Sequence, residues 1–149
     1  MTEPILLFGW GNPSRGDDAL GPLFIERIEA LHLPGVACLT DFQLQVEHAL
    51  DLENRERILF IDASIEAAAP FHHSRLLPAR DASFSTHAIT PESVMQVYVD
   101  LHDEDPPPCH QLAICGESFE LGEPLTAQAS ANLDAALAWT LAWIARKES

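Results

Sequence analysis

The chain has 149 residues, the size of one domain, and its 47% hydrophobic and 21% charged residues are typical of a globular protein rather than a disordered one. With 23 acidic and 8 basic residues the net charge is −15. A surface that acidic repels phosphate backbones and anionic headgroups, so we expect no binding to nucleic acid or membranes, and we expect a monomer. The apolar run Ala135–Ala145 is too short to span a bilayer.

The amino-terminal segment predicts a strand rather than a signal peptide, because it lacks a basic region and its apolar run leads directly into a glycine loop. The cysteines are odd in number and form no C-x-x-C pair; they are Cys38, Cys109 and Cys115. This pattern indicates neither a disulfide framework nor a zinc knuckle. We therefore expect free thiols and a cytoplasmic protein.

In chain order, the hydrophobic pattern predicts alternating strands and helices. The first half gives a strand, a helix, a second strand, a short helix and a third strand, at Ile5–Gly9, Ala19–Leu31, Val36–Thr40, Val46–Leu52 and Ile58–Ala63. The second half gives a weaker, edge-ward strand, a helix capped by Thr90 with Pro91 in its first turn, a strand, and a helix capped by Thr126. These lie at Ser74–Pro78, from Thr90 onward, at Gln111–Gly116 and from Thr126 to about Arg146, where basic residues suit the helix dipole.

This alternation predicts a single α/β domain: a three-layer sandwich with a mostly parallel five-stranded sheet in the flavodoxin-like order 2-1-3-4-5. In such a sheet ligands bind beyond the carboxyl ends of the strands. The loops after Gly9, Ile61 and Pro78 are therefore the places where we expect the functional residues.

The first loop is rich in glycine but does not match a nucleotide-binding motif. Position 14 is serine, where the dinucleotide fingerprint needs glycine or alanine. Gly11 and Gly16 have the spacing of a P-loop, but Asp17 and Asp18 stand where the lysine and the hydroxyl residue should be. Two carboxylates repel a phosphate, so a nucleotide-binding domain is disfavoured.

Both aspartates precede a predicted helix, where acidic residues stabilise the helix start. We expect Asp17 to be the N-cap, which leaves Asp18 open to another role. Asp62 ends an otherwise apolar strand, where a parallel sheet delivers side chains to its binding crevice. The alternative for Asp62 is a loop cap or a pair with Arg15 or Arg57.

A histidine in the loop before the Thr90 helix, His87, is the third candidate; its alternative is an ordinary surface residue. His102 and His110 flank an acidic proline loop and are expected to face solvent. Two carboxylates and one imidazole suit a borderline divalent ion and leave coordination positions open for substrate or water. Ser64 and Ser118 lack a G-x-S-x-G elbow, and no cysteine stands in a nucleophile context.

The same residues carry a resemblance to a family. Gly9-x-Gly-Asn12, then Asp17-Asp18-x-x-Gly21, then Asp62 in ILFIDAS, then Ser85-Thr-His87 resemble the motifs of the endopeptidases that process the large subunit of [NiFe] hydrogenases. The resemblance covers nearly the whole chain, and it implies a single α/β domain with a five-stranded sheet. It also implies one cut near the C-terminus of the large-subunit precursor, made after nickel has been inserted.

By this resemblance Asp18, Asp62 and His87 are the metal-binding and catalytic positions, and Asp41 matches a further acidic position near the cleft. The nickel belongs to the substrate and is the recognition signal, and no organic cofactor is implied. Some relatives have glycines after Asp41; here Phe42-Gln-Leu-Gln follows, which is similar to enzymes that serve soluble bidirectional hydrogenases.

Two questions stay open at this stage. The three residues either complete the coordination of the substrate's nickel or, in the case of the aspartates, act as general acid and base without metal. The protein is expected to be an aspartic-type or nickel-dependent endopeptidase; a non-catalytic nickel-binding maturation chaperone would use the same cleft.

Overall fold

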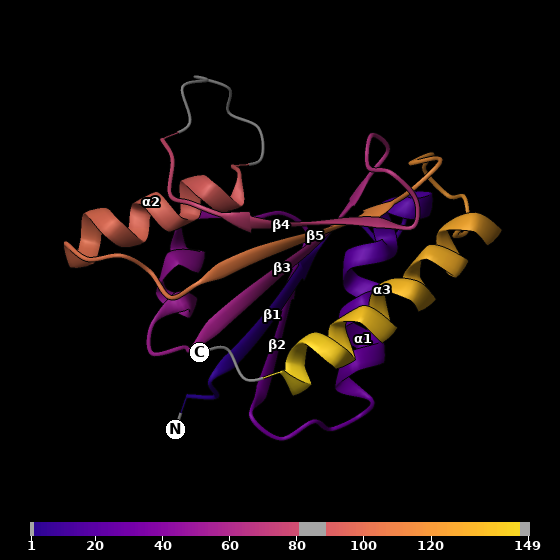
Figure 1. Ribbon diagram of the computed structural model, residues 1–149. Helices are drawn as coiled ribbons and strands as arrows, with labels where there is room; N and C mark the ends of the chain where they lie inside the picture. The colour runs from indigo at the N-terminus through magenta and orange to yellow at the C-terminus, as the bar shows by residue number, and fades with distance from the viewer. Residues whose placement is uncertain (1, 81–88, 147–149) are drawn as a thin grey trace.

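A single twisted sheet forms the centre of the molecule in the computed structural model, which describes residues 2–80 and 89–146 (Figure 1). Within these residues the sheet has five strands, in the order β2-β1-β3-β5-β4. Their bounds are β1 Ile5–Trp10, β2 Val36–Asp41, β3 Arg57–Ser64, β4 Phe71–Leu76 and β5 Cys109–Cys115. The pairs β2–β1, β1–β3 and β3–β5 are parallel, and β4 runs antiparallel to β5. The expected mostly parallel five-stranded α/β sheet is thus confirmed.

The expected order of the last two strands was wrong. Only residues 65–70 connect β3 to β4, which is too short for the crossover that a parallel neighbour needs. β4 therefore turns back and lies at the edge, beyond β5, with Leu76 opposite Cys109 at the start of that strand. Consequently the chain after Pro78 leaves the amino edge of the sheet, and not the carboxyl edge as expected.

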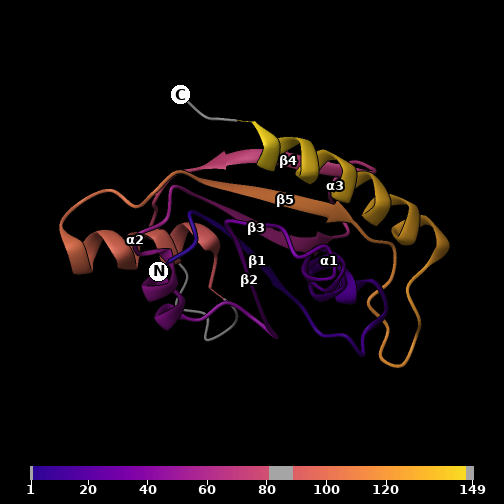
Figure 2. The same cartoon turned by 90° about the horizontal axis from the view of Figure 1, so that it is seen from below.

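Helices cover both faces of the sheet and complete the three layers (Figures 1 and 2). One face carries α1 (Leu20–Glu29) and α3 (Ala127–Ala145), and the other carries α2 (Pro91–His102) and the short 3-10 helix η2 (Val46–Leu52). A second 3-10 helix, η1 (Gly16–Ala19), precedes α1. Because successive strand residues point to opposite faces, Leu7 packs under α1 and α3 while Phe8 packs toward η2 and α2.

The starts of α2 and α3 confirm two of the predicted caps, Thr90 and Thr126. The hydroxyl oxygen of Thr90 accepts a hydrogen bond from the backbone N–H of Ser93, and that of Thr126 accepts one from Ala129. Among the described residues no helix has the length and the apolar character needed to cross a membrane.

A residue from the sheet, Arg57, binds the end of α3. The guanidinium of Arg57 donates to the carbonyls of Trp143 at 2.8 Å, Ile144 at 3.0 Å and Arg146 at 2.7 Å. It also lies 4.4 Å from the centre of the Trp143 ring. Arg57 is therefore not the partner of Asp62.

His110 is buried, which corrects the expectation that it faces solvent. Its position on β5 places it under α3, where its Nδ1 lies 3.0 Å from Nε2 of His73 on β4. Because β4 lies at the edge beyond β5, the start of β5 is enclosed by a neighbouring strand.

Candidate functional site

The glycine loop is folded tightly against the carboxyl ends of β1 and β3. A Cβ on Gly21 would overlap the carbonyl oxygen of Trp10 and lie 3.1 Å from that of Ile61. Gly11 has φ +149°, and a Cβ there would overlap the carbonyl oxygen of Asp18. These close approaches need glycine, and they hold Asp18 against the carboxyl edge of the sheet.

We expected Asp17 to be the N-cap, but the structure shows that it is not. The residue at the N-cap position of η1 is Arg15, and its side chain makes no capping hydrogen bond. The Asp17 carboxylate is buried and accepts four hydrogen bonds, from the backbone of Glu117, Ser118 and Thr126 and from the Thr126 hydroxyl. Burial acts to raise the pKa of Asp17, but these hydrogen bonds outweigh it and lower the pKa. Asp17 therefore joins η1 to the segment between β5 and α3.

The carboxylate of Asp18 accepts a hydrogen bond from the backbone N–H of Asn12 at 2.9 Å. Asp62 follows Ile58 and Phe60 on the face of β3 that carries α2. One of its oxygens accepts a hydrogen bond from Nε2 of Gln111 at 3.2 Å.

Among the described carboxyl groups, Asp62 has the most strongly altered pKa. Its pKa is raised to about 7, mainly because the carboxyl is removed from solvent. The hydrogen bond from Gln111 lowers the pKa, and the charges of Asp18 and Glu92 raise it further. The electrostatic effect of Asp18 indicates that the two predicted aspartates are brought together. A carboxyl group with this pKa can take up and release a proton near neutral pH, as a general acid or base requires.

His87 lies outside the described residues. Within residues 2–80 and 89–146, no three His, Cys, Asp or Glu side chains gather as a group that could hold a metal ion. The described part of the site therefore contains two of the three predicted ligands, Asp18 and Asp62. Glu92, in the first turn of α2, is a third carboxylate close enough to act on Asp62, and it was not predicted.

Asp41 lies apart from this pair. It ends β2 and is in register with Trp10 on β1, and Gly9 pairs with Ile61, so Trp10 lies between Asp41 and Asp62. Two strand spacings separate β2 from β3, which is about 10 Å. The side chains of Asp41 and Asp62 thus start two strands apart, and each carboxylate has its own hydrogen-bond partners.

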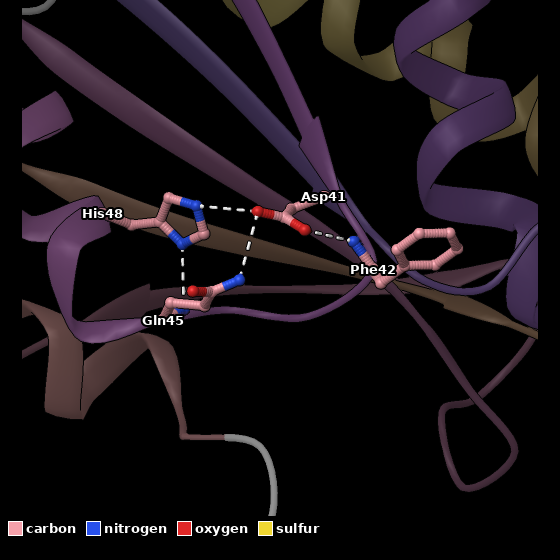
Figure 3. Close-up of polar contacts among 4 residues, drawn as sticks. All are labelled: Asp41, Phe42, Gln45 and His48. Carbon is pink, nitrogen blue, oxygen red and sulfur yellow. Dashed lines mark hydrogen bonds and ion pairs between the residues drawn. The ribbon is translucent and has the colours of Figure 1, made fainter.

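Three residues from the start of η2 and the turn before it fix the carboxylate of Asp41 (Figure 3). One oxygen accepts a hydrogen bond from the backbone N–H of Phe42 at 2.7 Å. The other lies 3.4 Å from Nε2 of Gln45 and 3.3 Å from Nε2 of His48.

The tautomer of His48 follows from its second contact. Its Nδ1 accepts a hydrogen bond from the backbone N–H of Gln45 at 2.8 Å, so the ring proton is on Nε2 and points to Asp41. The ring also packs edge-on against Phe8, with centroids 4.5 Å apart. His48 thus gives Asp41 a hydrogen bond from the neutral ring form.

The cysteines are free thiols, as predicted. Burial raises the pKa of Cys109 to about 12, and burial together with the charge of Glu29 raises the pKa of Cys38 to about 11. Thiols with such values carry almost no thiolate at neutral pH, so these two cysteines are not nucleophiles.

Sequence reasoning missed three residues that shape the site: Glu92, Gln111 and His48. Glu92 follows Pro91 at a helix start, where an acidic residue has an ordinary stabilising role. Gln111 is the polar residue in an otherwise apolar strand, and this was a usable signal. His48 stands three residues after Gln45, the spacing of a capping box, which the structure shows to be formed.

Comparison with known proteins gives no match to a family model and no match among curated proteins. Solved structures, however, match over nearly the whole chain. The [NiFe] hydrogenase maturation protease HycI from Thermococcus kodakarensis KOD1 has a TM-score of 0.76 and 20% identity, over 97% of this chain and 94% of its own. The hydrogenase maturating endopeptidase HybD from E. coli has a TM-score of 0.72 and 24% identity, over 94% and 91%. An endopeptidase from Escherichia coli has a TM-score of 0.71 and 25% identity, over 93% and 90%. The resemblance found in the sequence is confirmed in the fold: this chain has the fold of the hydrogenase maturation proteases.

Proposed function

We propose that this protein is an endopeptidase that removes the C-terminal extension of a [NiFe] hydrogenase large-subunit precursor after nickel insertion, and that it recognises the bound nickel. The observation that supports the proposal is that Asp62 and Asp18, whose charge raises the pKa of Asp62, lie at the carboxyl edge of a sheet with the fold of the maturation proteases.

In this proposal the nickel is part of the substrate, where the precursor's own cysteines hold it. Asp18, Asp62 and His87 bind to its open coordination positions and so place the scissile peptide at the edge of the sheet. Carboxylate and imidazole ligands suit such a borderline ion. Because these contacts form only when the precursor carries nickel, they discriminate loaded from unloaded precursor.

Asp62 also has the properties of a proton carrier. With a pKa of about 7 it can accept a proton from an attacking water and return it to the leaving amine. A metal-free role of this kind needs no nickel on the precursor, so the two roles make different predictions about unloaded substrate.

The test is cleavage of a purified large-subunit precursor, followed by gel mobility and by the mass of the released peptide. We expect the nickel-loaded precursor to be cut and the nickel-free one to be left intact. Asp62→Asn should abolish cutting, and Asp103→Asn should leave it unchanged. Asp103 is a matched control because the charge change is the same and its φ of 54° is a conformation that asparagine adopts readily.

Each other outcome has a defined meaning. Cutting of rigorously nickel-free precursor would refute nickel recognition and leave the protease assignment standing. Tight binding without any cut would favour a non-catalytic nickel-binding chaperone.

His87→Ala should abolish cutting while leaving the circular dichroism spectrum unchanged.

A further inference from the structure

One edge strand of the sheet, β2, lacks the usual protection against pairing with another chain. It ends the strand order, and in Figure 2 the strands follow one another from β4 at the top to β2 at the bottom. β2 contains no proline, lysine or arginine, and it pairs with β1 over six consecutive residues without a bulge. Edge strands usually carry such features, because an open edge accepts a further strand.

The backbone groups of β2 alternate between its partner strand and the open side. The carbonyls of Gly35 and Asp41 accept hydrogen bonds of 3.1 Å from the backbone N–H groups of Ile5 and Gly11. Because successive residues of a strand turn their backbone groups to opposite sides, the odd-numbered residues of β2 bind β1 and the even-numbered ones face away from it. Within residues 2–80 and 89–146 these outward N–H and C=O groups have no hydrogen-bond partner; they belong to Val36, Cys38 and Thr40.

A pocket of about 310 Å³ opens beside this edge, between the end of α1 and the first half of β2. Val36 and Cys38 form its β2 side, and both pack on the face of the sheet that carries α1 and α3. A strand added next to β2 places every second side chain on that same face. The pocket therefore lies where an added strand puts a side chain. Its other lining residues are Ile28, Glu29, His32 and Leu33.

The pocket is apolar inside and acidic at its rim. Ile28, Leu33 and Val36 supply aliphatic surface. Glu29, the last residue of α1, is exposed, and it has no ion-pair partner in the part of the chain that the structure describes. Burial and, after it, the charge of Glu29 raise the pKa of Cys38, so this carboxylate acts on the inside of the pocket. Such a pocket fits an aliphatic side chain with a positive charge next to it.

We propose that the open edge of β2 binds an extended, positively charged segment of another protein, which adds as a further strand with an aliphatic side chain in the pocket. Alternating N–H and C=O groups on an open edge are the recognition pattern for an extended polypeptide, and a side-chain pocket beside them gives specificity. The net charge of −15 attracts a basic segment and opposes a second copy of this chain. This edge has no part in the cleavage proposed above, because β1 lies between β2 and the strand of Asp62.

The test uses the full 149-residue protein and the peptide acetyl-KVLVK-amide, followed by the backbone amide resonances in nitrogen-15 NMR spectra. With the leucine opposite Cys38, its side chain enters the pocket, and both lysines lie on the same face, where one of them can meet Glu29. The valines lie on the other face of the sheet.

Strand addition has an alternating signature along β2. We expect the peptide to shift the N–H resonances of Val36, Cys38 and Thr40 and to slow the exchange of these protons with solvent. The N–H groups of Ala37 and Leu39 face β1, and their exchange should change little.

Methylated peptides separate strand addition from unspecific contact. In an antiparallel pair, the slightly more stable arrangement, the leucine N–H points to β2 and the N–H of the second valine points away. N-methylation of the leucine should weaken binding about ten-fold, because it removes a hydrogen bond and places a methyl group in the ladder. N-methylation of the second valine, the matched control, should leave binding unchanged. The reverse result would support strand addition in the parallel direction.

Two further comparisons test the pocket. Glu29→Gln should weaken binding of the peptide several-fold. Glu26→Gln should not, since it makes the same charge change at an exposed residue of α1 that does not line the pocket. The peptide acetyl-KVAVK-amide should bind several-fold more weakly to the parent protein, because alanine leaves the pocket unfilled.

Three results would overturn the proposal. The first is unmoved resonances at Val36, Cys38 and Thr40, and the second is an equal effect of the two methylated peptides. The third is slow exchange of these three N–H groups in the protein alone, together with a dimer in sedimentation, since the occupant would then be a second copy of the chain. Cleavage of the precursor tests the proposed function and not this edge, so the two proposals can fail separately.

Discussion

Replacement of Asp62 by asparagine should make the metal-free protein more stable at neutral and alkaline pH. The folded protein raises the pKa of Asp62 from 3.8 to about 7, so the carboxylate favours the unfolded chain over the native one. Each pKa unit corresponds to 1.36 kcal/mol, and the stabilisation from removing this group is therefore up to about 4 kcal/mol above pH 7. Asparagine keeps an oxygen that can accept the hydrogen bond from Gln111.

The pH dependence gives this prediction its sign. Below pH 3.8 the carboxyl is protonated in both states and the substitution has no electrostatic effect. Between pH 3.8 and about 7 the native state holds the proton more tightly, so the parent protein loses stability as the pH rises. The gain in the variant should grow over this window and become constant above it.

The measurement is urea unfolding, followed by far-ultraviolet circular dichroism at several pH values from 5.5 to 8.5, with Asp103→Asn as the matched control. A variant that is less stable than the parent at pH 8, or a gain that does not change with pH, would show that Asp62 has a structural role. Activity should be lost in the same variant, so that stability and function move in opposite directions.

Two further substitutions test other parts of the structure. Asp17→Ala leaves four donors without their acceptor and should lower the free energy of unfolding, measured in urea, by about 3–5 kcal/mol. Because the pKa of Asp17 is lowered in the folded protein, the greater stability of the parent should be present above pH 3.8 and shrink as the pH falls below it. Arg57→Met keeps an apolar contact for Trp143 but removes three hydrogen bonds to the end of α3, and should cost about 3 kcal/mol and speed amide exchange in residues 142–146.

The elements of this fold were predictable because the signals for them are local. The caps at Thr90 and Thr126 and the short helix Val46–Leu52 occur where the pattern placed them. The weak strand signal predicted an edge position for β4, which is confirmed. Its place beyond β5 was not predicted, because the decisive quantity is the length of the connection before it rather than the composition of the strand. Six residues, 65–70, force the chain to turn back, and this overrides the analogy with a fully parallel sheet.

In the candidate site, too, the residues with local signals were predictable and those with distant partners were not. A strand that ends in an aspartate predicted the place of Asp62, since the fold alone delivers that side chain to the edge. The role of Asp17 was missed because its partners lie about a hundred residues further along the chain, at Glu117 and Thr126. From the local pattern alone, an aspartate just before a helix is expected to have the ordinary capping role. The separation of Asp41 from Asp62, by contrast, follows from the predicted strand order 2-1-3, which the structure confirms.

The carboxylates of the neighbouring residues Asp17 and Asp18 bind different parts of the chain: Asp17 binds the segment between β5 and α3, and Asp18 binds Asn12 in the glycine loop. This difference bears on how the segment between β5 and α3 can be altered. This segment contributes none of the proposed active groups, yet its backbone supplies three of the four donors to Asp17 and also binds Gly16 and Ser14. A shortened or exchanged version would release the turn that presents Asp18, and an activity assay would report a damaged active site although every acid in it is unchanged. Surface redesign, tagging or loop exchange in residues 117–126 therefore calls for the same controls as a substitution of Asp18 itself.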